Sequence, residues 1–156
     1  MNGSTIVTPE LVGRAYQALA SGDMEQIKQY WADDINWLVP GNHALAGWYR
    51  GLDGFLGFMA SVGRLSGNSF NMETVTILTN DEYSADVTHN LGYRANADRD
   101  SESPYDKLDI DVIHLLRWRD GKVVEGRGAI FGDGTTRFNQ FWSQLDSAGN
   151  RVEQGQ

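Results

Sequence analysis

The 156-residue sequence has no cysteine and only three histidines. The absence of cysteine excludes disulfide bonds, thiolate nucleophiles and thiolate metal ligands. The histidines lack the spacing of a zinc motif such as HExxH, so no metal site is expected. A Walker loop and a GxGxxG dinucleotide motif are also missing, and we expect no cofactor.

Positive charge and long apolar runs are scarce as well. The 13 Lys and Arg residues are scattered and are outnumbered by 21 Asp and Glu, whereas phosphate backbones require clustered positive charge. No run approaches the roughly 20 apolar residues of a membrane span. The first residues, MNGSTIVTPEL, show no export signal. We therefore expect a cytoplasmic protein that binds neither nucleic acid nor membrane.

The remaining composition, 40% hydrophobic and 22% charged, is typical of one globular domain. The polar residues 1–8 are expected to form a flexible N-terminus. Residues 9–145 are expected to form a single domain, followed by a disordered tail at 146–156.

Helical patterns come first along the chain, and strand patterns follow. Thr8-Pro9-Glu10 is a typical helix start, with Thr as the N-cap and proline in the first turn. From residue 68 onward, apolar side chains alternate as in half-buried antiparallel strands. This order predicts an α+β fold. The expected helices are 9–20, 24–33, 52–63 and 135–145, and the expected strands are 35–40, 69–78, 82–95, 107–118 and 122–131.

The hairpin at residues 109–128, DIDVIHLLRWRDGKVVEGRG, places an imidazole among aliphatic side chains. Because successive strand residues point to opposite faces, His114 shares one face with its apolar neighbours at alternate positions. Asp109 and Asp111 fall on the other, outward face. On the returning strand, glycines occupy inward positions where a packed core would hold valine. The two inward sets are Ile110, Val112, His114 and Leu116, and Val124, Gly126, Gly128 and Ile130.

Several segments in this order resemble the SnoaL-like, nuclear-transport-factor-2-like superfamily. They are YQALASGDMEQIKQYWADDINWLVPG, LAGWYRGLDGFLGFM, IHLLRWRDGKVVEGRG and RFNQFWS. The resemblance covers roughly residues 9–145. It implies a cone-shaped barrel, in which a curved antiparallel sheet wraps over about three helices and encloses an apolar pocket. It also implies a homodimer packed sheet to sheet.

The resemblance implies that His114 lies in the pocket. It also implies that catalytic residues of the known enzymes with this fold are replaced in this sequence. Against the ketosteroid isomerases, Tyr16 matches the oxyanion-binding tyrosine, His114 takes the place of the donor carboxylate, and Val39 takes the place of the base. Against the SnoaL-type cyclases, His114 matches the histidine, but Gly128 replaces the aspartate. The aspartate of limonene-type epoxide hydrolases also falls near Gly128. None of these three mechanisms is therefore expected unchanged.

The hypothesis that remains is general acid–base chemistry on a small apolar carbonyl or polyketide-like ligand. His114 would be the base, since an apolar pocket favours neutral imidazole, and Tyr16 would donate to a developing oxyanion. Help could come from His43, His89, Asn90 or Asp133. The expected ligand-binding residues are Trp37, Val39, Phe58, Met59, His89, Val112, Gly126, Gly128 and Ile130.

Two other classes of function stay open. The same pocket without a competent base would make a non-catalytic small-molecule binding protein, with His114 serving only as a core histidine. A protein–protein interaction module would instead need an exposed apolar patch. The aromatic side chains that could form one are Trp48, Tyr49, Phe138, Phe141 and Trp142.

Overall fold

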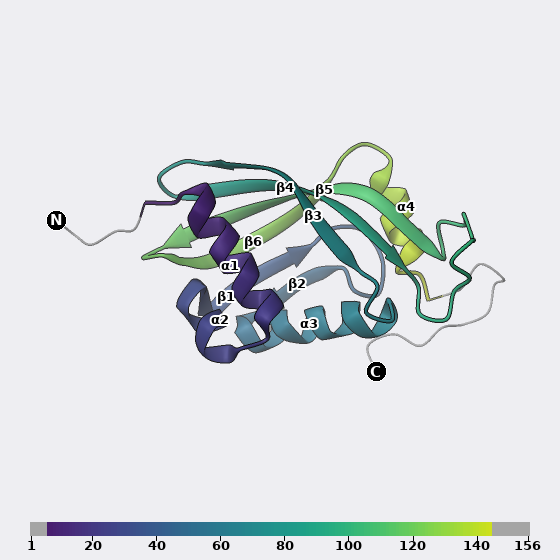
Figure 1. Cartoon of the computed structure of the whole chain (residues 1–156), viewed down its shortest axis with the longest axis horizontal. Coiled ribbons are helices and arrows are strands. Elements are labelled where there is room, and N and C mark those ends of the chain that lie inside the picture. Colours follow the sequence, from purple (N-terminus) through teal and green to yellow (C-terminus); the bar gives the residue numbers. More distant parts are fainter. Residues whose placement is uncertain (1–5, 145–156) are drawn as a thin grey trace.

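The computed structural model describes residues 6–144 and forms an α+β fold from four helices and one six-stranded sheet within that range (Figure 1). The order along the chain is α1 (Pro9–Ser21), α2 (Met24–Tyr30), β1 (Trp31–Val39), β2 (Gly47–Arg50), α3 (Gly51–Leu65), β3 (Asn71–Thr79), β4 (Tyr83–Tyr93), β5 (Lys107–Arg119), β6 (Lys122–Ile130) and α4 (Gly134–Phe141).

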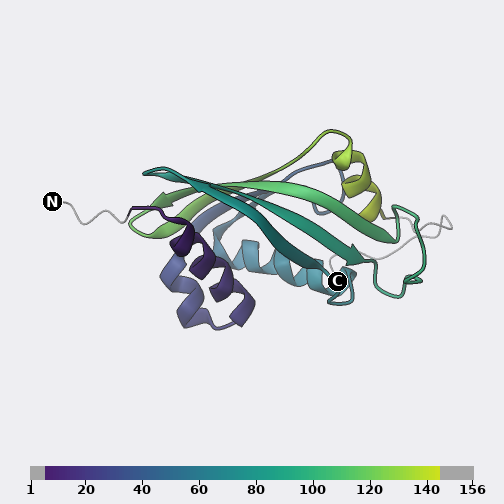
Figure 2. The ribbon, with the colours of Figure 1, turned by 45° about the horizontal axis from the view of Figure 1, so that its top comes forward.

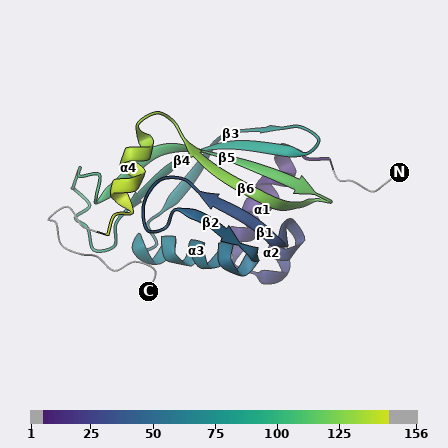
Figure 3. The ribbon, with the colours of Figure 1, turned by 180° about the vertical axis from the view of Figure 1, so that it is seen from behind.

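The sheet is open and mixed, with the strand order β2-β1-β6-β5-β4-β3. Four of its five pairings are antiparallel, but β1 runs parallel to β6, with Trp37 opposite Gly126. Figure 3 shows these two strands side by side, with β2 at the edge. The predicted α+β fold with a curved antiparallel sheet is thus found with one parallel pair. A parallel pair needs a long crossover, and here the chain between β1 and β6 contains the rest of the sheet.

The helix starts and ends follow local chemistry. The Thr8 hydroxyl accepts a hydrogen bond from the Leu11 amide at 3.1 Å, and Gly22 ends α1 in the left-handed region with φ 70°. The second helix is shorter than predicted, because Trp31 is fully buried and already begins β1. Residues 47–50, predicted as loop, form the short edge strand β2. The expected end of α4 at residue 145 lies outside the described residues.

The sheet curves over α1, α2 and α3, which lie on its concave side (Figure 2). The core between these layers contains aromatic rings packed against one another at tilted angles, including Trp31, Trp37 and Phe55. No helix among residues 6–144 is long and apolar enough to cross a membrane.

The pairing of β4 with β5 sets the register of the candidate site. It places Asp86 directly opposite His114. At the far end of β5, a bulge after Arg117 shifts the register with β6, so Val123 rather than Val124 joins the core cluster. The bulge thus changes one predicted member of the inward face of β6, although Val124 is also buried.

Candidate functional site

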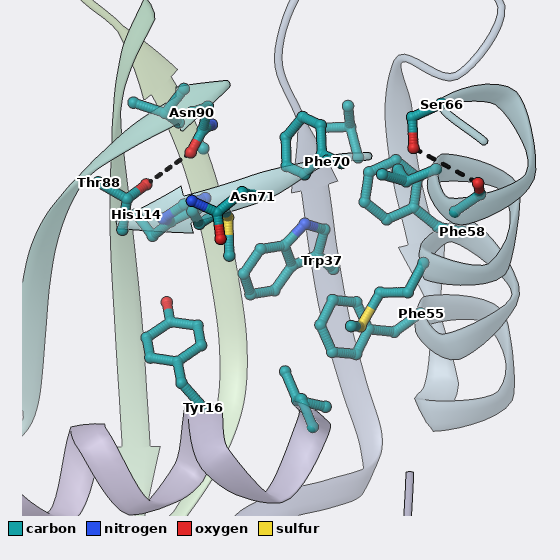
Figure 4. A pocket seen from close by; sticks show the side chains of 18 of the residues that line it. Tyr16, Trp37, Phe55, Phe58, Ser66, Phe70, Asn71, Thr88, Asn90 and His114 are labelled. Atoms are coloured by element: carbon teal, nitrogen blue, oxygen red, sulfur yellow. Dashed lines mark hydrogen bonds between the residues drawn. The ribbon is translucent and has the colours of Figure 1, made fainter. Parts of the chain in front are cut away.

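A cavity of about 510 Å³ lies between the helices and the concave face of the sheet. Its volume is within the range of small-molecule sites. Side chains from α1, α3, α4 and most strands line it, and Figure 4 shows its aromatic wall facing a polar strand surface. Of the described residues that line it, none is Asp, Glu, Lys or Arg. The lining includes Tyr16, Trp37, Val39, Phe55, Phe58, Met59, Phe70, Thr88, Asn90, Val112, His114 and Gly128.

His114 lines this cavity and is hydrogen-bonded to a buried carboxylate. Its Nδ1 lies 2.9 Å from Oδ2 of Asp86, whose side chain is 1% exposed. The other oxygen of that carboxylate, Oδ1, accepts the hydroxyl of Tyr16 at 2.7 Å. The result is a chain of hydrogen bonds, Tyr16–Asp86–His114, that joins α1, β4 and β5.

The chain fixes which ring nitrogen of His114 carries the proton. An ionised carboxylate can only accept, so Nδ1 of His114 must be the donor toward Asp86. In the neutral imidazole, Nε2 is then the nitrogen with a free lone pair. A buried aspartate also stabilises the imidazolium that forms when Nε2 takes up a proton. The arrangement is therefore chemically suited to a general base.

The hydroxyl of Tyr16 donates to Asp86, whereas it was predicted to donate to a ligand oxyanion. Its single hydroxyl proton is donated to Asp86, so it cannot also be donated to a ligand oxyanion. Burial, together with the negative charge of Asp86 and the hydrogen bond to it, raises the pKa of Tyr16 well above its ordinary value. The phenol thus stays protonated and positions Asp86.

Aromatic rings hold the imidazole from two sides. The His114 ring centroid lies 5.7 Å from that of Trp37 and 6.4 Å from that of Tyr16. With only 8% of His114 exposed, the ring has few alternative rotamers. Its position is therefore set by both packing and hydrogen bonding.

The glycines of β6 serve close packing rather than leaving open space. A Cβ added to Gly126 would overlap the ring of Trp37, and one added to Gly128 would come within 2.9 Å of Pro40 Cδ. Gly128 still lines the cavity, but Gly126 does not. Ile130, also predicted to contact ligand, packs beside Gly134 and is not among the lining residues.

The structure separates the remaining predicted residues into two groups. Trp37, Val39, Phe58, Met59 and Val112, all predicted to bind ligand, line the cavity. His89 does not, because the opposite alternation of β4 turns it to the outer face of the sheet.

His89 instead lies between two carboxylates on that outer face. Nδ1 is 2.8 Å from Asp111 and Nε2 is 2.7 Å from Asp109, and its side chain is 42% exposed. The hydrogen bond to Asp111 raises the pKa of His89, and the charges of both carboxylates add to this effect. The prediction that both aspartates lie on the outward face agrees with this arrangement.

The other proposed helpers differ in their surroundings. His43 bonds to the Pro40 carbonyl at 3.0 Å and to the Leu45 amide at 3.1 Å, so both ring nitrogens hold the loop after β1. Burial lowers its pKa. Asp133 stands at the start of α4, and its side chain makes no capping hydrogen bond. Of these helpers, only Asn90 lines the cavity.

Asp86 is the functional residue that the sequence analysis missed. In the segment YSADVTHN, the apolar Ala85 and Val87 alternate with polar side chains, and the apolar set would ordinarily be assigned to the core. The structure buries the polar set instead. One signal was present: a run of four small polar residues at alternate positions, Ser84, Asp86, Thr88 and Asn90, beside a strand with an inward histidine.

Comparison with known proteins agrees with this fold. The family model of the SnoaL-like domain matches residues 12–126. Uncharacterised proteins of Mycobacterium tuberculosis and Mycobacterium bovis are each 32% identical over 138 residues, which cover 86% of this chain and 87% of theirs.

Similar solved structures have lower sequence identity, so they bear on the fold alone. A protein from a soil-derived mobile gene cassette has a TM-score of 0.72 and 22% identity, over 85% of this chain and 94% of its own. An NTF2-like protein of Burkholderia xenovorans gives 0.65 and 20%, over 83% and 93%. A candidate polyketide cyclase of Sinorhizobium meliloti gives 0.58 and 11%, over 78% and 95%. Because the SnoaL-like model matches most of the chain, the protein belongs to the SnoaL-like family.

Proposed function

We propose that this protein is an enzyme that moves a proton next to a carbonyl group, in an isomerisation, cyclisation or dehydration of a small apolar ligand. The observation that carries the proposal is the 2.9 Å contact between Nδ1 of His114 and the buried carboxylate of Asp86, inside a cavity of ligand size. An oriented histidine of this kind contributes about 10²–10⁴-fold to rate as a general base.

The proposed step begins at Nε2 of His114. Its lone pair takes a proton from the carbon beside the carbonyl, and the carbon–hydrogen bonding electrons move toward the carbonyl oxygen to form an enolate. The imidazolium, stabilised by Asp86, then returns the proton to another atom of the ligand or to a leaving oxygen. The step needs no cofactor, and Tyr16 acts only by holding Asp86.

The surroundings support base chemistry on an apolar ligand. The cavity lining is mainly apolar and aromatic, which suits an apolar ligand. A structurally similar protein described as a candidate polyketide cyclase is consistent with chemistry on polyketide-like carbonyl compounds.

The test is exchange of the hydrogens beside the carbonyl of neutral cyclic ketones, beginning with tetralone, in deuterium oxide and followed by NMR. We expect the protein to accelerate exchange and His114→Gln to remove the acceleration. His89→Gln is the matched control, because it changes a histidine of the outer face and should leave exchange unchanged.

Exchange that persists in His114→Gln would contradict the proposal. Ketones that bind without any accelerated exchange would favour the alternative, a non-catalytic binding protein with the same cavity.

A further inference from the structure

The inward face of β4 is polar along its whole length. Ser84, Asp86, Thr88 and Asn90 are each at most 4% exposed. Buried polar groups are almost always hydrogen-bonded, so each of these side chains should have an identifiable partner. Ser84 accepts the indole N–H of Trp118 at 2.8 Å, and Asp86 accepts from Tyr16 and His114.

The other two side chains, Thr88 and Asn90, form a hydrogen bond with each other that does not use the NH₂ group of Asn90. The Thr88 hydroxyl donates to Oδ1 of Asn90 at 3.0 Å, shown by the dashed line in Figure 4. This bond occupies the amide oxygen of Asn90 and leaves its NH₂ group with two donors. Among residues 6–144, no group accepts a hydrogen bond from that NH₂, although Asn90 is 3% exposed and lines the cavity.

The NH₂ group of Asn90 is accessible from the cavity, so a ligand acceptor that enters the cavity can take a hydrogen bond from it. The cavity lining supplies the other constraints on that ligand. It contains no Asp, Glu, Lys or Arg among the described residues, so nothing there would pair with a charged ligand. Trp37, Phe55 and Phe58 offer aromatic surface for a ring.

We infer that Asn90 is the specificity-determining residue of the cavity, and that its NH₂ group binds a carbonyl oxygen of an uncharged, ring-containing ligand, distinct from the carbonyl beside which His114 acts. This deepens the proposed function by naming how its substrate is recognised. Asn90 stands four residues from Asp86 on β4, which is about 13 Å along a strand. It therefore holds a part of the ligand remote from His114 and governs affinity rather than proton transfer.

The experiment measures binding of prodan, a neutral dimethylaminonaphthyl ketone whose emission shifts to the blue in apolar surroundings. The analogue with the carbonyl reduced to a methylene group is the matched probe. We expect Asn90→Leu to weaken prodan binding about tenfold, the scale of one lost hydrogen bond, and to leave binding of the analogue unchanged. Asn42→Leu, which removes an exposed amide that is not part of the cavity lining, should change neither.

Asn90→Asp provides a second variant should Asn90→Leu fail to fold. Its side chain has the same shape and still accepts from Thr88, but it lacks both N–H donors, so it should also weaken prodan binding. Equal prodan affinity in the wild type and in these variants would overturn the inference. So would an equal loss for both probes, tighter binding of naphthoate than of prodan, or no prodan binding by the wild type.

These measurements need no turnover, so the two hypotheses fail separately. Unchanged prodan affinity in the Asn90 variants, with exchange lost in His114→Gln, refutes only the role of Asn90. Weakened prodan affinity without any ketone exchange in the wild type refutes only the catalytic proposal.

Discussion

Asp86→Asn is the substitution that most sharply probes the hydrogen-bond chain. The carboxylate of Asp86 accepts from Tyr16 and from His114 at the same time, at 2.7 and 2.9 Å. An asparagine of the same shape has one accepting oxygen and one donating NH₂ group, so it can accept from only one of them. When its oxygen accepts from Tyr16, its NH₂ faces Nδ1 of His114.

That geometry forces the imidazole of His114 into the other tautomer. Nδ1 must then accept, and the proton moves to Nε2, which can no longer act as the base. We therefore expect Asp86→Asn to slow ketone exchange by roughly 10²–10⁴-fold, the full contribution of a general base. Replacement of the oriented aspartate in a serine protease triad acts through the same tautomer change.

The expected effect of Asp86→Asn on stability is smaller. A charge-assisted hydrogen bond contributes about 1.5–3 kcal/mol, and its loss is partly offset because a carboxylate no longer has to be desolvated. We therefore expect a net loss of about 1–2 kcal/mol, or roughly 2–8 °C in Tm for a chain of this size. Asp109→Asn, at an exposed carboxylate, is the matched control and should alter neither exchange nor Tm appreciably.

The assay combines ketone exchange in deuterium oxide with thermal denaturation of the same samples. A folded Asp86→Asn variant with the exchange rate of the wild type would refute the orienting role of Asp86. A variant that lost both exchange and cooperative unfolding would show instead that the chain of hydrogen bonds is needed for folding.

Three further predictions concern the rest of the molecule. The pKa of His89 is raised in the folded protein, so its contribution to stability should be complete below about pH 6.5 and should fade as the pH rises through the folded pKa. His89→Gln should therefore reduce the fall in Tm above about pH 6.5. Gly126→Ala should lower stability by about 1–3 kcal/mol in denaturant titrations, because its Cβ would overlap the Trp37 ring, whereas Gly13→Ala in open space should not destabilise. We also propose a homodimer through the outer sheet face, so light scattering should give twice 17.4 kDa for the wild type. Leu78→Lys, which replaces a side chain that is 64% exposed by a charged one, should give a smaller mass. A monomeric wild type would refute the dimer.

The fold class and the inward position of His114 could be predicted because both depend on periodicity within short segments of the sequence. Alternation along β5 is unbroken around that histidine, and helix signals such as Thr8 act over a few residues. The parallel pairing of β1 with β6 depends on residues about 90 positions apart, such as Trp37 and Gly126, and no local pattern encodes it.

The partner of His114 was hidden for the same reason. Asp86 meets it across a hairpin whose connection is long, so the register could not be fixed from turn chemistry. Gly126 could not be interpreted correctly from the sequence for a similar reason. The glycine leaves room beside the strand, but only the structure shows that the Trp37 ring fills it. The alternate polar side chains of β4 could either face solvent or line a site. Only the pairing with β5 shows which of the two holds.

The most direct test of the central claim is heteronuclear NMR of the His114 ring nitrogens at a pH where the imidazole is neutral. We expect Nδ1 to be protonated and hydrogen-bonded to Asp86. We expect Nε2 to be unprotonated, with a signal that shifts when a neutral cyclic ketone is added. A proton on Nε2, or a ring that does not respond to ketone, would contradict it.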